Sequence, residues 1–413
     1  MMHNMNVILS NLKTIFTSIY NKKKYMKKVN REYLKWDSCQ YDVVDIMRFP
    51  LAVLVIYIHC TIGLPEKPID LNNMTILYQW DGLLKIYISK IISTICVPSF
   101  FMISGYLFYQ KQKVFNLIVF KNKLQRRIRT LFIPYIVWIM LYFIISNLLL
   151  IRQSALTDFI DWYILVKNYF MNNGALRIFW DCNIIDNHQN NLPIGNIQDD
   201  SAPLLFTLWY IRDLIIVILL SPIVFKVLCF FNFYFILLLG IAYIFNLWPY
   251  IHGISIVSIF FFTLGIYLSS NINLIELIIN RYAKRLLFIG FLLSMLSLYQ
   301  YSTNSPFLIY FIHSFSILGV FITIYIGWIL INRGIKPITI LKKSAFFIYA
   351  AHMVYVNRYC TQLVLEILPW NNSLCGLIHY LIIPFVIALS CIIIIYILQR
   401  ICPWTLSLLN GGR

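Results

Sequence analysis

Two ionisable side chains bracket an apolar stretch near the start of the sequence. Arg48 and His59 stand at the ends of "RFPLAVLVIYIH", and the ten residues between them are all apolar or aromatic. At about 100° per residue, an eleven-residue offset on a helix leaves both side chains on nearly one stripe, about 16 Å apart along the axis. A guanidinium can bind an anion, and an imidazole can accept a proton near neutral pH. The spacing therefore predicts a polar track along one helix.

A lipid bilayer restricts where such a track can face. An unpaired charge deep in a bilayer costs several kcal/mol, so we expect Arg48 to face protein or water. Asp45 lies three residues earlier on the same helical face and is the expected ion partner of Arg48. In the alternative interpretation, Arg48 extends to the cytoplasmic headgroups and His59 bonds to a neighbouring helix.

Composition places the whole chain in the membrane. Of the 413 residues, 60% are hydrophobic and only 12% are charged, and the mean hydropathy is +0.75. Soluble proteins carry roughly 25% charged residues. The net charge of +18 comes from Lys and Arg clustered between apolar runs. Such clusters set the orientation of a membrane protein, so we do not expect nucleic-acid binding.

The apolar runs predict the architecture. A membrane-spanning helix needs about 20 mainly apolar residues. This criterion predicts an all-α polytopic bundle of about ten transmembrane helices, with only "CFFNFYF" separating the fourth from the fifth. The predicted crossings are 43–63, 85–109, 130–151, 204–228, 231–249, 253–270, 285–302, 306–331, 341–363 and 377–400.

Loop charges predict the orientation of the bundle. Residues 1–42 hold eight Lys and Arg, and residues 110–129 hold seven with no acid, whereas residues 152–203 hold three against six Asp. Because basic loops stay in the cytoplasm, both termini are expected there. The expected units are a basic N-terminal tail (1–42), a transmembrane domain (43–403) with an extracytoplasmic loop (152–203), and a C-terminal tail (404–413). The loop is rich in Asn, Asp and aromatic residues, which suits either contact with sugars or an ordered cap on the bundle.

Several motifs, in order along the chain, resemble one known family. "DIMRFPLAVLVIYIH" (45–59) is similar to the opening signature of the membrane acyltransferase-3 family, in which Arg, ten residues and then His occur in the first membrane helix. The later landmarks are "VPSFFMISGYLF" (97–108), "RRIRTLFIPYIVW" (126–138), "LWYIRDLIIVILLSP" (208–222), "FFFTLGIYLS" (260–269) and "FFIYAAHMVYV" (346–356). The resemblance spans residues 42 to about 400.

The resemblance implies a membrane-bound O-acyltransferase in the bacterial cytoplasmic membrane. Such an enzyme takes an acyl group, usually acetyl from cytoplasmic acetyl-CoA, and delivers it to a hydroxyl of an envelope glycan or glycolipid. The resemblance makes His59 and Arg48 the expected catalytic residues, with Asp45 orienting Arg48. Membrane lipids and separate glycan-assembly proteins are the expected partners, and no metal is expected.

Other residues in the matched motifs are supporting candidates. Arg126, Arg127 and Arg129 enter the third crossing from the cytoplasm and are expected to bind the phosphates of CoA, although basic residues there also serve orientation. Lys121 and Lys123 are weaker candidates for the same contact.

The remaining candidates lie inside predicted crossings. Ser104 and Gly105 suit helix packing or the lining of a donor tunnel. His352 suits either a second polar site or a bond between helices. Trp209 opens the fourth crossing, where Arg212 and Asp213 are expected to form an interfacial pair.

Intramembrane charges also fit a different class of protein. A transporter or flippase for a glycan-related or anionic substrate would use Arg48 and His59 for substrate or proton coupling and would need no CoA.

Overall fold

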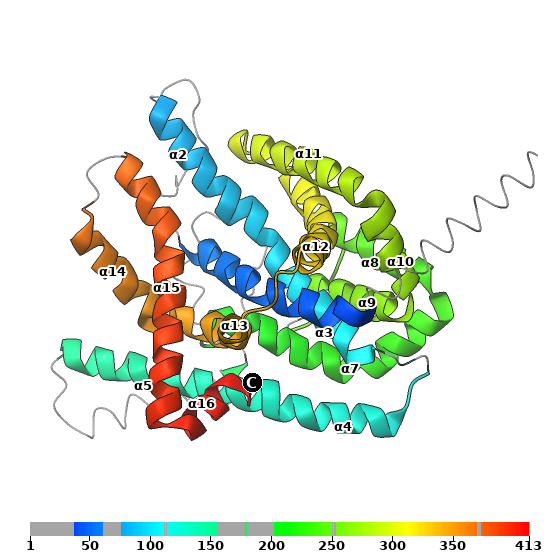
Figure 1. Cartoon of the computed structure of the whole chain (residues 1–413), viewed down its shortest axis with the longest axis horizontal. Coiled ribbons are helices and arrows are strands. Elements are labelled where there is room, and N and C mark those ends of the chain that lie inside the picture. The colour runs from blue at the N-terminus through cyan, green and yellow to red at the C-terminus, as the bar shows by residue number, and fades with distance from the viewer. Residues whose placement is uncertain are drawn as a thin grey trace, which may run out of the picture.

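The computed structural model describes most of the chain. The described residues are 37–60, 76–110, 112, 114–154, 178–179, 202–249, 251, 253–369 and 373–412. Every element in this part is a helix (Figure 1). Most of the predicted tail 1–42 and of the predicted loop 152–203 lies outside these residues.

The first half of the chain forms three helical rods, which are followed by a short turn and three separate helices. The first helix covers residues 37–59 and is blue in Figure 1. The second rod joins α2 (Ile76–Ile86), η1 (Tyr87–Ile91), η2 (Ile92–Ile95) and α3 (Cys96–Tyr109). The third joins α4 (Leu117–Arg127), η3 (Ile128–Phe132) and α5 (Ile133–Ser154). The short turn η6 (Phe206–Leu208), α7 (Trp209–Phe231), α8 (Phe233–Ile244) and α9 (Ile256–Ser270) follow.

The second half of the chain continues this pattern of long helices. A rod of α10 (Ile272–Leu277), η7 (Ile278–Tyr282) and α11 (Ala283–Ser302) precedes α12 (Leu308–Asn332). Next come α13 (Thr339–Ala351), η8 (His352–Val356), α14 (Asn357–Ile367), α15 (Ser373–Ile401) and α16 (Pro403–Asn410).

Each predicted crossing overlaps one of these helices, and six of the described helices are long and apolar enough to span a membrane. The six are Asp81–Tyr109, Leu117–Ser146, Phe206–Phe231, Ile272–Ser302, Leu308–Asn332 and Leu374–Ile401. The apolar helices α8 and α9 are shorter. The first helix carries three charges, Asp42, Asp45 and Arg48, in its apolar part, and a kink divides α13 from α14. The number ten and the orientation therefore stay predictions.

Helices α3 and α9 pack together through two glycines. A Cβ on Gly105 would lie 2.1 Å from the carbonyl oxygen of Phe262, and a Cβ on Gly265 would lie 2.1 Å from that of Met102. The two backbones therefore touch where neither residue has a side chain. This contact confirms the packing interpretation of Gly105. Most residues of α9 are buried, so the α3–α9 pair forms the centre of the fold.

The C-terminal residues are folded onto the bundle. Pro403 occupies the first turn of α16, and Gly411 ends the helix with a φ of 64°. The backbone carbonyl of Leu409 accepts a hydrogen bond of 2.9 Å from the Trp138 indole, and the Asn410 amide donates one of 3.1 Å to the carbonyl of Lys343. The segment predicted as a C-terminal tail thus joins α5 to α13.

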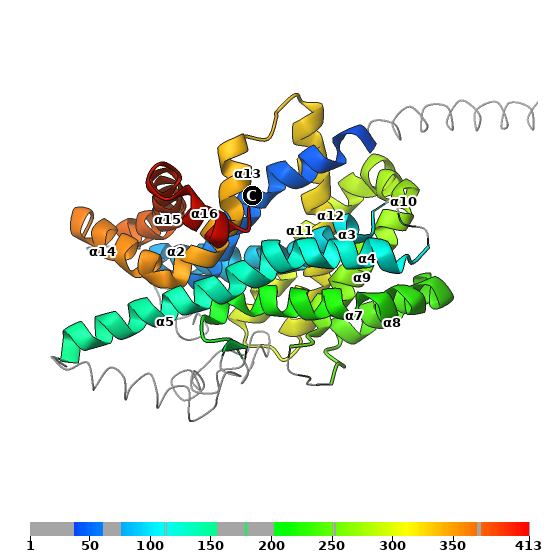
Figure 2. The same cartoon turned by 90° about the horizontal axis from the view of Figure 1, so that it is seen from below.

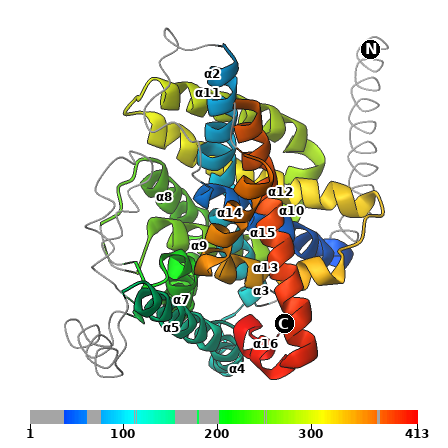
Figure 3. The ribbon, with the colours of Figure 1, turned by 90° about the vertical axis from the view of Figure 1, so that its left-hand side faces the viewer.

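Two groups of helices pack around the first helix and its candidate residues Arg48 and His59. The rod of α4 and α5 runs beside α7 (Figure 2). Helix α15 packs against both α14 and α2 (Figure 3). The two ends of the first helix meet different neighbours: Asp45 contacts α13, and His59 contacts η6 and η8.

Candidate functional site

The first helix is unbroken from residue 37 to residue 59, so the eleven-residue offset between Arg48 and His59 keeps its helical geometry. The Arg48 guanidinium donates to the Asp45 carboxylate at 2.6 Å. Lys342 of α13 donates to the other carboxylate oxygen at 3.0 Å. This confirms the expected Arg48–Asp45 pair. Because Asp45 bridges two cations, it fixes both side chains at this end of the site.

The same end gathers further cations from α4. Of the three arginines predicted to bind CoA, Arg127 is half-buried, whereas Arg126 and Arg129 are exposed. The Arg127 guanidinium lies 5.9 Å from the centre of the Phe108 ring and is in electrostatic contact with Arg48.

Lys123 lies one helical turn before Arg127 and shares its aromatic neighbour. Its ammonium is 5.5 Å from the centre of the Phe108 ring and donates to the Phe108 carbonyl. The cluster of Arg48, Lys123 and Arg127, which we call the cationic end, is therefore held by contacts with α3 and the first helix. Guanidinium and ammonium groups so placed suit a phosphate-bearing ligand.

Ser104 and Trp209 lie between the cationic end and the other half of the site. The Ser104 hydroxyl is 3.4 Å from the Tyr210 hydroxyl. Trp209 packs on Phe101, with ring centres 6.4 Å apart. Tyr210 is also in electrostatic contact with Arg127 and packs on Tyr349 at 5.6 Å. The start of α7 thus connects α3 and α4 with α13.

His59, at the far end of the first helix, meets a second histidine. The ring centres of His59 and His352 are 5.3 Å apart and the rings are tilted by 34°. Phe206 packs edge-on against His59 at 5.1 Å. Lys90 is in electrostatic contact with His59 from η1. His59 therefore faces protein, and its neighbours come from three other segments of the chain.

The hydrogen bonds of His352 determine its tautomer. The ring is fully buried, and Nδ1 lies 2.7 Å from the Tyr349 carbonyl and 3.2 Å from the Ile348 carbonyl. Since carbonyl oxygens only accept, Nδ1 of the neutral ring carries the hydrogen and Nε2 keeps its lone pair. Nε2 has no hydrogen-bond partner among the described residues. His352 thus bonds within its own helix, and its free nitrogen is available beside His59.

A cavity of about 420 Å³ adjoins His59, with polar side chains set in a mainly apolar wall. Its lining residues are His59, Cys60, Tyr142, Met353, Tyr355, Asn357, Arg358, Thr361, Gln362, Tyr380 and Ile383. The wall at η8 is kinked, with Val354 at ψ 67° and Tyr355 at φ 61°. A tyrosine with positive φ is strained, and such strain clusters at functional sites. The kink turns α14 so that its first residues border the cavity.

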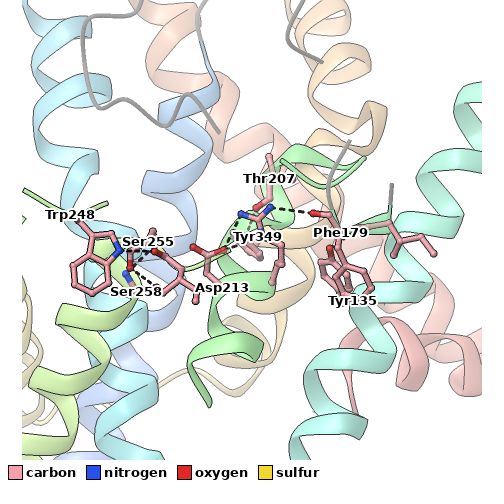
Figure 4. Close-up of polar contacts among 11 residues, drawn as sticks. Tyr135, Phe179, Thr207, Asp213, Trp248, Ser255, Ser258 and Tyr349 are labelled. Carbon is pink, nitrogen blue, oxygen red and sulfur yellow. Dashed lines mark hydrogen bonds and ion pairs between the residues drawn. The ribbon is translucent and has the colours of Figure 1, made fainter. Parts of the chain in front are cut away.

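The first turn of α7 contains a buried ion pair between Arg212 and Asp213 (Figure 4). Arg212 Nε and Nη2 each lie 3.0 Å from the Asp213 carboxylate, and Arg212 Nη1 donates to the Phe179 carbonyl at 3.2 Å. Both side chains are about 1% exposed. The expected interfacial pair is therefore an interior one, because Tyr135, Tyr349 and the 178–179 segment cover it.

Sequence reasoning missed three groups at this site. Lys342 and Lys90 lie far along the chain from their partners, and neither belongs to a motif. The polar face of α14 that carries Arg358 becomes part of the site only through the kink. Lys123 was predicted only as a weaker candidate, and its spacing of four residues from Arg127 places both on one helical face.

One comparison identifies the family of this chain. The family model described as an acyltransferase domain, acyltransferase-3, matches residues 41–400. No curated protein and no solved structure matches the chain. The matched range includes both the cationic end and the histidine pair. Because it covers nearly the whole sequence, the chain belongs to the acyltransferase-3 family of membrane acyltransferases.

Proposed function

We propose that the protein transfers acetyl from cytoplasmic acetyl-CoA to a hydroxyl of a cell-surface or exported glycan. The observation that carries the proposal is that one helix presents His59 to a cavity with polar side chains in its wall and Arg48 to a cluster of cations. Acyl transfer needs a cationic site for the donor and a base for the acceptor, because CoA is a polyanion and the acceptor hydroxyl must lose a proton. The family match supplies the reaction class.

The donor binds at the cationic end. Arg127 and Lys123 contact CoA phosphates, and Arg48 holds an oxygen nearer the thioester. Guanidinium forks form bidentate bonds with phosphate, and Phe108 keeps the two α4 cations from turning to solvent. Asp45 partly neutralises Arg48, which limits repulsion among the cations before the donor arrives. In this arrangement CoA stays on the cytoplasmic side, and both termini face the cytoplasm.

The reaction takes place at the histidine pair. A ring nitrogen of His59 accepts the proton of the acceptor hydroxyl as its oxygen attacks the thioester carbonyl carbon. Lys90 and the surrounding dipoles stabilise the negative charge that develops on the carbonyl oxygen. The carbon–sulfur bond then breaks, and the proton on His59 passes to the leaving thiolate of CoA. His352 orients His59 and can share its proton through Nε2.

The test is acetyl transfer by the full-length protein in lipid nanodiscs with radiolabelled acetyl-CoA and an envelope glycan extract. Because the chain has nine cysteines, released CoA is measured by chromatography and not with a thiol reagent. We expect glycan-dependent CoA release, which His59→Gln lowers by about 10²- to 10⁴-fold. Binding of acetyl-CoA to that variant should be unchanged.

Paired variants test the donor site. Lys123→Gln and Arg127→Gln should raise the KM for acetyl-CoA, and Arg129→Gln should raise it less because Arg129 is exposed. Lys284→Gln is the matched control, since Lys284 is an exposed lysine on a different rod. Glycan uptake into vesicles without acetyl-CoA, combined with wild-type CoA release by His59→Gln, would contradict the proposal.

A further inference from the structure

The first turn and a half of α14 turns polar side chains toward the cavity at His59. Asn357, Arg358, Thr361 and Gln362 all line it. They form two pairs with a spacing of four residues, so they share one helical face. The kink at Tyr355 aims this face at His59 instead of continuing the line of α13. The kink therefore determines which face of α14 forms the cavity wall, and that face carries the four polar side chains.

These four side chains differ in what they already bind. The Thr361 hydroxyl donates to the side-chain oxygen Oδ1 of Asn357 at 3.3 Å, and the Asn357 side-chain nitrogen donates to the sulfur of Met353 at 3.7 Å. Arg358 and Gln362 form no ion pair or hydrogen bond with another described residue, and both are exposed at the cavity. The wall thus has one internally fixed pair and one pair whose donors are available to a ligand.

The electrostatics of the cavity favour an anion. None of the described residues that line the cavity is acidic, whereas Arg358 carries a permanent positive charge. Lys90 adds a second cation in electrostatic contact with His59. A sugar hydroxyl would accept a single hydrogen bond from the guanidinium, whereas a carboxylate or phosphate would accept two of its N–H groups and also balance its charge.

The remaining lining suits a sugar. The faces of Tyr142 and Tyr355 are stacked with ring centres 6.2 Å apart, and Tyr380 lines another part of the wall. Aromatic faces pack on the C–H faces of sugars, and side-chain amides pair with hydroxyls. A volume of about 420 Å³ lies within the usual range of ligand pockets.

We propose that this cavity is the acceptor subsite and that it selects a glycan carrying an anionic group, a carboxylate or a phosphate, which Arg358 binds while His59 faces the hydroxyl to be acylated. This inference rests on the proposed function and narrows its acceptor. A lipid headgroup has the same oxyanion chemistry. The glycan is favoured because Arg358 shares its cavity with His59, the amides and three tyrosine rings.

The first experiment uses the native acceptor. Mass spectra of surface glycans are compared between a deletion strain and strains complemented with wild type, Arg358→Gln, Arg358→Lys or the control Arg333→Gln, an exposed arginine outside the cavity. We expect the acetyl esters that depend on the protein to lie on glycans with a carboxylate or phosphate. Arg358→Gln should lower their abundance about ten- to hundredfold, with Arg358→Lys intermediate and Arg333→Gln unchanged.

The outcomes separate this inference from the proposed function. If the deletion removes acetyl esters from neutral glycans, the enzyme acts as proposed and the anionic subsite is wrong. The subsite is also wrong if Arg358→Gln leaves acetylation unchanged. If no acetyl ester depends on the protein, both proposals fall.

A second experiment distinguishes glycan from lipid. With purified protein and glycan extract in phosphatidylcholine nanodiscs, added salt should raise the wild-type KM for the glycan and leave that of Arg358→Gln nearly constant. If Arg358 binds headgroups instead, Arg358→Gln will alter activity only when phosphatidylglycerol is present, and that result would overturn the inference.

Discussion

Gly105→Ala tests the close backbone contact between α3 and α9. The new Cβ would lie 2.1 Å from the Phe262 carbonyl oxygen, and since contacts under 3.0 Å essentially never occur, α3 and α9 must separate locally by about 0.9 Å. A gap of 0.5–1 Å forfeits roughly a quarter to a half of each dispersion contact. Overpacking costs about 1–3 kcal/mol, and the better helix propensity of Ala returns about 1 kcal/mol. Because the obstructing atom belongs to the backbone, no side chain can rotate away, so we expect the cost at the upper end of its range and a net loss of about 2 kcal/mol.

Two other glycines provide a graded comparison. A Cβ on Gly240 would meet only ring atoms of Phe260 at 3.5 Å, which is ordinary contact. Gly240→Ala should therefore be neutral or stabilising by up to about 1 kcal/mol. A Cβ on Gly290 would meet the flexible end of Ile322 at 2.5 Å, so Gly290→Ala should fall between the other two.

The measurement is the unfolding free energy in mixed micelles with increasing dodecyl sulfate, followed by circular dichroism. Acetyl transfer by each variant is measured alongside. Gly105→Ala should also lower transfer, because α3 carries the Phe108 ring that holds the cationic end. If Gly105→Ala and Gly240→Ala shift the unfolding free energy in the same direction and by the same amount, the argument from backbone contact is refuted.

Three further predictions concern charge and backbone conformation. Asp213→Asn leaves a buried cation without its counter-charge and should cost about 3–5 kcal/mol, measured as lost folded protein after mild detergent extraction; retention equal to wild type would contradict the buried pair. Asp45→Asn frees Arg48 and Lys342, so kcat/KM for acetyl-CoA should fall about ten- to hundredfold, and Asp45→Glu should recover part of it. Asn232 has φ 49° between α7 and α8, so Asn232→Val should destabilise by about 1–3 kcal/mol in the micelle titration and Asn232→Gly should not.

The sequence was sufficient for features that depend on short-range pattern. Hydropathy placed a helix at each predicted crossing, and the three-residue spacing identified Asp45 as the partner of Arg48. The break between α7 and α8 occurs at Asn232 within "CFFNFYF", where it was expected. Pro403 and Gly411 are ordinary helix-boundary signals that also mark α16, although the segment was predicted as a tail.

Features that depend on contacts across the chain could not be predicted. His59 and His352 are 293 positions apart, and nothing in either motif shows that their rings meet. The sequence around the kink at Tyr355 contains no Gly or Pro that would predict it. The positive φ is instead imposed by tertiary packing. Arg127 is more buried than Arg126 and Arg129 because its face of the helix meets Phe108. Basic composition alone predicts CoA contact equally for all three arginines.

The turn η6 connects the buried ion pair with His59, the proposed base. Phe206 packs edge-on against His59, and the next residue, Thr207, accepts a hydrogen bond at its carbonyl from Tyr349 of α13. One turn later, Arg212 is bonded to Asp213 and to the carbonyl of Phe179. A buried pair of this kind contributes little net stability compared with apolar residues of similar size. We therefore expect its main effect to be on the position of the neighbouring backbone. Because a base must sit within hydrogen-bond reach of its proton, a small shift of Phe206 would move His59 out of range while the fold stayed intact. In the proposed mechanism, the ion pair therefore supports acyl transfer by fixing the first turn of α7, directly after the turn whose Phe206 contacts His59.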